Sequence, residues 1–80
     1  MYTVYILHSE SISRYYVGYT ANVMQRLKYH NVGKNKSTKV GIPWKIIRQE
    51  HFDNKRDAWL REHQIKSYKG GVAFKKLIQS

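Results

Sequence analysis

The chain has 80 residues, which is enough for one domain with a small sheet and a few helices. Fifteen Lys and Arg against five Asp and Glu give a formal charge of +10, so a polyanion is the first partner to expect. A hydrophobic content of 41% argues against a disordered basic tail, the absence of Cys excludes a disulfide framework, and no apolar run is long enough for a signal peptide or a membrane span. We therefore expect one folded, soluble, cytoplasmic domain over residues 1–80, with no membrane association.

The first half of the chain predicts a β-hairpin followed by a helix. Residues 2–8 and 15–20 are rich in β-branched and aromatic side chains and are joined by a short polar stretch. Residues 21–31 then place apolar side chains on one helical stripe, with Thr20 as the expected N-cap. Residues 32–44 carry Gly, Pro and three lysines without the period of a helix or strand, so we expect a basic loop there.

The second half predicts a strand and two helices. Residues 44–52 have the composition of a third strand. Residues 54–69 form the second predicted helix, with Asn54 as N-cap and Asp57 three residues later, a variant of the capping box. Residues 72–79 follow two glycines and predict a short third helix. The expected class is α+β, with the element order β-β-α-β-α-α.

Three tyrosines surround one glycine in the stretch RYYVGYT. Because side chains alternate along a strand, Tyr16 and Gly18 share one face, and antiparallel pairing can bring Tyr5 of the first strand onto the same side. The other two tyrosines of the stretch, Tyr15 and Tyr19, then point to the opposite face. A glycine in a strand often marks the close approach of a ligand or another backbone, and a substrate phosphate fits the bare face beside Tyr16.

The two longer predicted helices carry further polar residues at informative positions. Arg26 and His30 are four residues apart, so one side of the first helix presents a guanidinium and an imidazole together. Glu62 falls at helical spacing between Ala58 and Ile65, where amphipathic patterning favours an apolar residue. A carboxylate there needs a partner, and a buried cation or a divalent metal fits that role. Taken singly, these features have ordinary structural explanations, such as an i, i+4 pair of Glu62 with Lys66.

In combination, the motifs resemble the GIY-YIG nuclease superfamily. The stretches that carry the likeness are VYIL, YVGYT, QRLKYHN, the Lys/Gly loop and LREHQIK. The first tripeptide, residues 3–5, is Thr-Val-Tyr and departs from Gly-Ile-Tyr, whereas residues 16–18, Tyr-Val-Gly, are close to the second motif. More narrowly, the chain is similar to the small stand-alone bacterial group of predicted endonucleases in this superfamily. The likeness covers nearly the whole chain.

The resemblance implies a three-stranded antiparallel sheet flanked by helices, and one concave catalytic site. The residues that match the family site are Tyr5, Tyr16, Arg26, His30 and Glu62. Glu62 would hold a single divalent cation, Mg²⁺ or Mn²⁺, because one carboxylate plus the scissile phosphate is a sufficient anchor for an ion that keeps several waters.

Hydrolysis further needs a base and positive charge. We expect Tyr5 to act as base, with its pKa lowered by Arg26, the metal or a protonated His30, and Tyr16 to be the second candidate, as base or as a donor that orients water. Arg26 would bind the phosphate through its fork of donors, and His30 would relay the proton or orient a tyrosine.

Substrate binding is expected to be mainly electrostatic. The lysines of the basic loop, Lys34, Lys36 and Lys39, are expected to contact phosphates beside Gly18, with DNA favoured over RNA. Several family members have a C-terminal Asn near the site, and this chain has none after Glu62, although Gln79 is available. The alternatives are a non-catalytic nucleic-acid-binding module on the same fold and, ranked third, a basic RNA-associated or ribosome-associated structural protein. Neither alternative requires a carboxylate in a cationic groove, since carboxylates repel phosphates.

Overall fold

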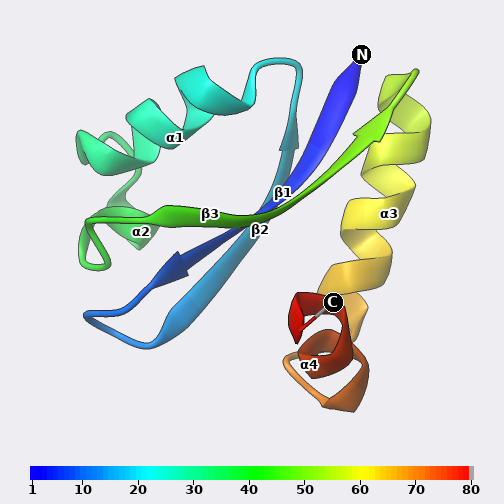
Figure 1. Cartoon of the computed structure of the whole chain (residues 1–80). Helices are drawn as coiled ribbons and strands as arrows, with labels where there is room; N and C mark the ends of the chain where they lie inside the picture. Colours follow the sequence, from blue (N-terminus) through cyan, green and yellow to red (C-terminus); the bar gives the residue numbers. More distant parts are fainter. Residues whose placement is uncertain (80) are drawn as a thin grey trace.

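The computed structural model describes residues 1–79 and has the predicted α+β architecture (Figure 1). Ser80, the last residue of the predicted domain, lies outside the described residues. Three antiparallel strands form one sheet in the order β2-β1-β3, so the first strand is central. None of the helices in this part of the chain is long and apolar enough to cross a membrane. In chain order the elements are β1 (Tyr2–Ser9), β2 (Arg14–Thr20), α1 (Val23–Asn31), α2 (Lys36–Lys39), β3 (Lys45–Phe52), α3 (Lys55–Ser67) and α4 (Val72–Gln79).

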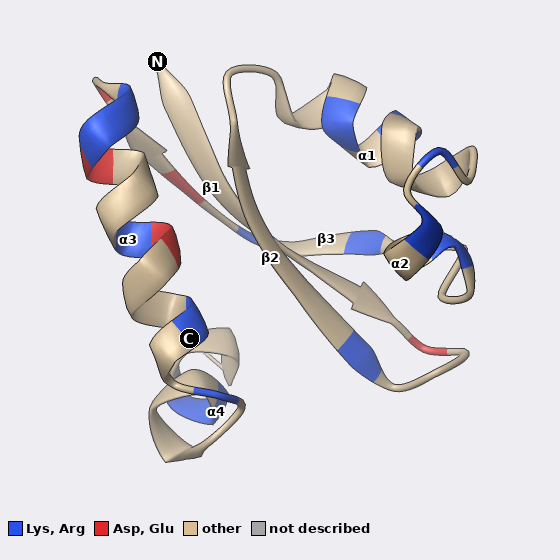
Figure 2. Ribbon diagram, turned by 180° about the vertical axis from the view of Figure 1, so that it is seen from behind, with Lys and Arg blue, Asp and Glu red and all other residues tan. Residues whose placement is uncertain are grey.

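Helices cover both faces of the sheet. α1 and α2 lie on one side and α3 and α4 on the other, and Lys and Arg occur on helices of both layers (Figures 1 and 2). Because its side chains alternate, β1 contributes to two cores. Val4 and Ile6 pack with the apolar side chains of α3 and α4, whereas Tyr5 and Leu7 pack with Trp44 and the stripe of α1. The central strand is therefore buried on both faces.

The helix starts are set by asparagine side chains. The prediction of Asn54 as N-cap is confirmed, since its Oδ1 accepts a hydrogen bond from the Asp57 amide at 2.9 Å. The prediction of Thr20 as N-cap of the first helix is wrong. Thr20 is the last residue of β2, and α1 begins two residues after Ala21, with Asn22 accepting from the Gln25 amide at 3.1 Å.

The basic segment between α1 and β3 contains a single helical turn, α2, where a loop was expected. Asn35 caps this turn, with its Oδ1 accepting from the Ser37 amide at 2.9 Å. The indole Nε1 of Trp44 donates to the Thr38 carbonyl at 2.6 Å and so ties the turn to the start of β3. Four residues are too few to show a helical period, which is why the sequence pattern did not indicate this element.

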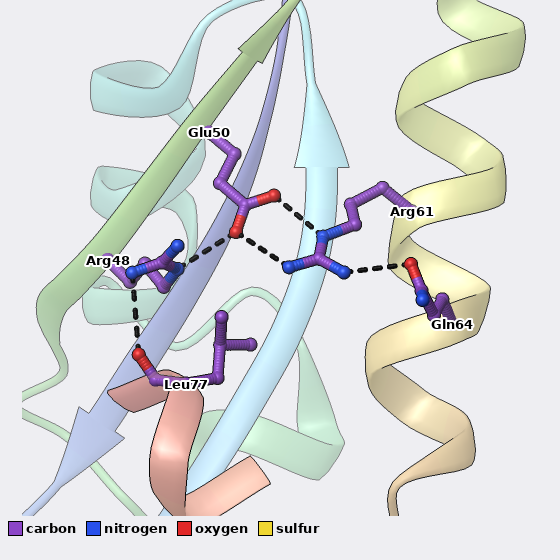
Figure 3. A network of polar contacts seen from close by, with 5 residues as sticks. All are labelled: Arg48, Glu50, Arg61, Gln64 and Leu77. Atoms are coloured by element: carbon purple, nitrogen blue, oxygen red, sulfur yellow. Dashed lines mark hydrogen bonds and ion pairs between the residues drawn. The ribbon is translucent and has the colours of Figure 1, made fainter. Parts of the chain in front are cut away.

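A partly buried ion network joins β3 to the second helical layer (Figure 3). Glu50 accepts from Arg61 of α3 at 2.7 and 3.1 Å, a bidentate pair, and from Arg48 Nε at 2.8 Å. Arg48 also donates to the Leu77 carbonyl of α4 at 3.4 Å, and Arg61 to Gln64 at 2.8 Å. The carboxylate thus holds α3 and, through Arg48, α4 against the edge strand.

The charge of Glu50 makes the stability of this layer dependent on pH. The hydrogen bonds from Arg61 and then Arg48 hold the pKa of Glu50 below its ordinary value of 4.5, against the opposing effect of burial. Its contribution is therefore complete above about pH 4.5 and is lost as the pH falls through the lowered folded pKa. We expect Glu50→Gln to lower the free energy of unfolding by at least about 1 kcal/mol at pH 7, and this difference to shrink at lower pH.

Urea denaturation of both proteins at neutral and acidic pH measures this difference. Glu10→Gln is the matched control, because the Glu10 side chain is 75% exposed and meets only Lys45, at 3.4 Å. Its effect should stay within about 0.5 kcal/mol at either pH. If the difference in free energy of unfolding between the wild type and Glu50→Gln does not change with pH, packing and not charge accounts for the lost stability.

Candidate active site

The two tyrosines of the predicted site lie on one face of the β1–β2 hairpin. In the strand register Tyr5 pairs with Gly18 and Leu7 with Tyr16, and the Tyr5 and Tyr16 ring centroids are 6.3 Å apart. This confirms the prediction from side-chain alternation. Tyr5 is 1% exposed, whereas Tyr16 is only partly buried. Tyr19, as predicted, points the other way and packs against the core under α3.

Gly18 makes room for the phenol of Tyr5. A Cβ at Gly18 would lie 2.6 Å from the Tyr5 hydroxyl oxygen and 2.8 Å from its Cζ, distances that real side chains do not reach. The bare face of the strand was expected to receive a substrate phosphate, and this expectation needs correction, because the Tyr5 ring already fills the space. The glycine therefore fixes the position of a tyrosine.

His30 connects this tyrosine to the basic segment. The imidazole is 0% exposed, with Nε2 3.4 Å from the Tyr5 hydroxyl and Nδ1 2.9 Å from the Thr38 hydroxyl. Thr38 donates its own proton to the Asn35 carbonyl at 3.4 Å, so its oxygen accepts from Nδ1–H. The lone pair of Nε2 is then directed at the Tyr5 hydroxyl. Thr38 completes this chain of hydrogen bonds, although no pattern around it indicated this role.

Burial determines the protonation of both groups. Burial, and secondarily the charge of Arg26, lowers the pKa of His30, so the imidazole is neutral at pH 7. Burial, and then Tyr16, raises the pKa of Tyr5 to about 12, which exceeds the lowering by the Arg26 guanidinium. We expected Arg26, the metal or a protonated His30 to lower the pKa of Tyr5. Arg26 does lower it, but burial outweighs this effect and the net shift is upward. His30 is not the cation, because its own pKa is lowered.

Arg26 lies one helical turn before His30 on α1, as its spacing predicted. Its Cζ is 4.6 Å from the centroid of the Tyr29 ring, a cation–π contact that holds the guanidinium beside the site. Arg26 also lines a surface hollow of about 520 Å³ together with Tyr29 and Lys34. Lys36 and Lys39 are exposed on α2. Of the predicted phosphate-binding lysines, Lys34 therefore lies beside Arg26, and Lys36 and Lys39 are exposed on the neighbouring α2.

Glu62 approaches from α3, on the buried stripe with Ala58 and Ile65. Its side chain is 10% exposed, and its oxygens lie 3.5 Å from Lys66 Nζ and 3.5 Å from His63 Nδ1. Its charge is the smallest of the contributions that raise the pKa of Tyr5, after burial and Tyr16. The i, i+4 contact with Lys66 is formed, and the position has the ion-pair partner that we judged necessary.

Glu62 offers a single carboxylate, with Lys66 and His63 as its neighbours. Among residues 1–79 there is no group of three or more His, Cys, Asp or Glu side chains arranged to hold a metal ion. A single carboxylate is nevertheless the kind of anchor that Mg²⁺ uses with substrate phosphates, because this ion keeps most of its waters. Gln79, which is available where several family members have an Asn, is the last residue of α4, a helix that packs with α3 under Val4 and Ile6.

Comparison with known proteins agrees with this geometry. Residues 1–74 match the GIY-YIG catalytic domain. A UPF0213 protein of Staphylococcus haemolyticus is 42% identical over 66 residues, which cover 81% of this chain and 79% of the relative. A UPF0213 protein of Haloquadratum walsbyi is 41% identical over 66 residues, covering 81% and 73% of the two chains. The solution NMR structure of a UPF0213 protein from Bacillus halodurans superposes with a TM-score of 0.62 at 30% identity, covering 99% of this chain and 84% of that one. The chain therefore belongs to the GIY-YIG family, within the UPF0213 group, which occurs in archaea as well as bacteria.

Proposed function

We propose that the protein is a metal-dependent endonuclease that hydrolyses phosphodiester bonds of nucleic acid. The observation that carries this proposal is the hydrogen-bonded chain from Thr38 through His30 to Tyr5, with Arg26 and Glu62 acting on the same tyrosine. A neutral imidazole, a phenol, a guanidinium and a carboxylate together supply a proton acceptor, a phosphate ligand and a cation ligand. A domain that only binds phosphate has no need for the carboxylate.

The proton path follows from the protonation states. A phenol with a pKa of about 12 is protonated at neutral pH, so Tyr5 can accept a proton from the attacking water only as it gives up its own. The neutral Nε2 of His30 is the acceptor for that proton. Tyr5 and His30 would thus act as a relay, which requires no free phenolate. Tyr16, the more exposed of the two tyrosines, remains the second candidate for contact with the water.

The charged residues complete the proposal. Arg26 would bind the scissile phosphate and stabilise the charge that develops on its oxygens. Glu62 would hold one Mg²⁺ or Mn²⁺, and such an ion, when bound, supplies Lewis-acid stabilisation of a phosphate oxygen. Lys34, Lys36 and Lys39 would contact the flanking backbone, with DNA as the favoured substrate.

One observation favours the second candidate function, a nucleic-acid-binding module that does not cleave. Glu62 is already paired with Lys66 at 3.5 Å, so its charge is partly compensated without a metal, and His63 Nδ1 lies 3.5 Å from its other oxygen. These partners are 52% and 55% exposed and can turn away into water, which leaves the carboxylate available to a cation. We therefore rank the nuclease first.

A cleavage assay distinguishes the two functions. The purified protein is incubated with supercoiled DNA, single-stranded DNA and structured RNA in Mg²⁺, Mn²⁺ or EDTA. We expect cleavage in either metal and none in EDTA. Binding of all substrates without cleavage would assign the module function, and cleavage that persists in EDTA would exclude the proposed role of Glu62.

A further inference from the structure

A second feature of α3 lies outside the chain of catalytic residues. A surface hollow of about 560 Å³ is lined by Tyr19 of β2 and by Lys55, Arg56 and Trp59 from the first turns of the helix. The indole of Trp59 is 44% exposed and belongs to neither hydrophobic core. The other tryptophan, Trp44, is 4% exposed and donates its indole N–H to the Thr38 carbonyl. Packing therefore explains Trp44 and leaves Trp59 without a structural role.

The hollow is adjacent to the proposed metal ligand. Trp59 and Glu62 are three residues apart, which is about 4.5 Å along a helix. The ring of His63 stacks on the indole with centroids 4.0 Å apart, and its Nδ1 is 3.1 Å from the Trp59 carbonyl and 3.5 Å from Glu62. The half-exposed ring of His63 thus contacts the indole on the part of α3 that also carries the carboxylate.

The lining of the hollow combines aromatic surface with positive charge. Lys55 and Arg56 are exposed cations, and the acid next to them, Asp57, is bound to the Asn54 side chain at 3.1 Å. Lysine and arginine alone are sufficient to contact a phosphate backbone. An exposed indole adds a flat aromatic surface, which contacts to phosphates do not require. Aromatic side chains beside cations are the recurring means by which proteins bind unstacked bases. A base inside a duplex has both faces covered by its neighbours.

We propose that this hollow binds one unpaired nucleobase next to the scissile phosphate. The base stacks on Trp59, with Tyr19 as the second wall, and Lys55 and Arg56 contact the adjoining phosphates. This inference rests on the proposed nuclease function for the position of the scissile bond, and it adds a preference for single-stranded or frayed nucleic acid over intact duplex.

Binding measured in EDTA tests the inference independently of cleavage. The probes are fluorescently labelled oligo(dT) of about 12 nucleotides and a labelled duplex of the same length, followed by anisotropy at low salt. We expect Trp59→Leu to weaken binding of the single strand by about 5- to 150-fold and to leave duplex binding nearly unchanged, and Trp59→Phe to retain most of the affinity. Intrinsic fluorescence of the wild type should be quenched by the single strand, since Trp59 is the exposed indole.

A neighbouring residue supplies the matched control. Leu60 is also on α3 and is 48% exposed, so Leu60→Ala should bind both probes like the wild type. An unchanged affinity of Trp59→Leu for the single strand, or an equal loss on both probes, would overturn the stacking site. If the protein cleaves nucleic acid and Trp59→Leu binds the single strand like the wild type, the nuclease proposal stands and the stacking site is rejected. If binding depends on Trp59 but no cleavage occurs, the stacking site stands and the nuclease proposal is rejected.

Discussion

Replacement of Glu62 by glutamine is expected to lower the cleavage rate by on the order of 10³-fold, because it removes the one carboxylate proposed to hold the metal. Glutamine keeps the shape of the side chain on the buried stripe between Ala58 and Ile65. The ion pairs that are lost involve half-exposed partners, so the free energy of unfolding should change by less than about 1 kcal/mol. The measurement is initial cleavage rate in Mg²⁺, together with urea denaturation.

Two comparisons make the Glu62 result specific. Glu10→Gln removes an equal charge from an exposed position and should cleave like the wild type. Binding of oligo(dT) in EDTA by Glu62→Gln should be unchanged or tighter, because a carboxylate near phosphate is repulsive. Full cleavage by Glu62→Gln purified in parallel would point to a contaminating nuclease or to another mechanism.

Introduction of a single methyl group at Gly18 is expected to damage both folding and catalysis. The new Cβ would meet the Tyr5 hydroxyl at 2.6 Å, and the ring cannot swing freely because it is buried beside Tyr16 and His30. We expect Gly18→Ala to lower the free energy of unfolding by about 1–3 kcal/mol. Displacement of the Tyr5 hydroxyl from Nε2 of His30 by about 1 Å should reduce cleavage by roughly 100-fold.

A second substitution tests the cause of the Gly18 effect. Tyr5→Leu removes the hydroxyl and the outer ring atoms, so Gly18→Ala should cost less in that background, with a coupling energy of at least about 0.5 kcal/mol in urea denaturation. If Gly18→Ala lowers the free energy of unfolding equally in the wild type and in Tyr5→Leu, the alanine disturbs the strand itself. Cleavage should not return in the double variant, because the relay tyrosine is absent.

Much of the site was predictable because it depends on short-range periodicity. Strand alternation placed Tyr5, Tyr16 and Gly18 on one face, and helical spacing placed Arg26 above His30. Both periods are local properties of the backbone and need no knowledge of tertiary structure. The same reasoning identified the apolar stripe of α3 on which Glu62 lies.

Features that depend on tertiary contacts were not predictable. The direction of the pKa shift of Tyr5 follows from burial between two layers, and sequence shows nearby charges without showing how deeply a ring is enclosed. Thr38 acquires its role because α2 folds back on α1, and a single turn leaves no period to detect. The Glu50 network joins residues from three elements that lie far apart in sequence, β3, α3 and α4. Asn22 was missed as the N-cap of α1 because β2 extends through Thr20.

The four-residue length of α2 has a consequence for the proton acceptor. One turn of helix has almost no stability of its own, so α2 depends on contacts with the rest of the fold, including the bond from the Trp44 indole to the Thr38 carbonyl. Since Thr38 is also the partner of His30 Nδ1, the proposed role of Nε2 as proton acceptor depends on Trp44, which itself packs in the core beside Tyr5. A substitution of Trp44 would therefore lower the cleavage rate as if proton transfer were impaired, although its origin is the loosening of one helical turn.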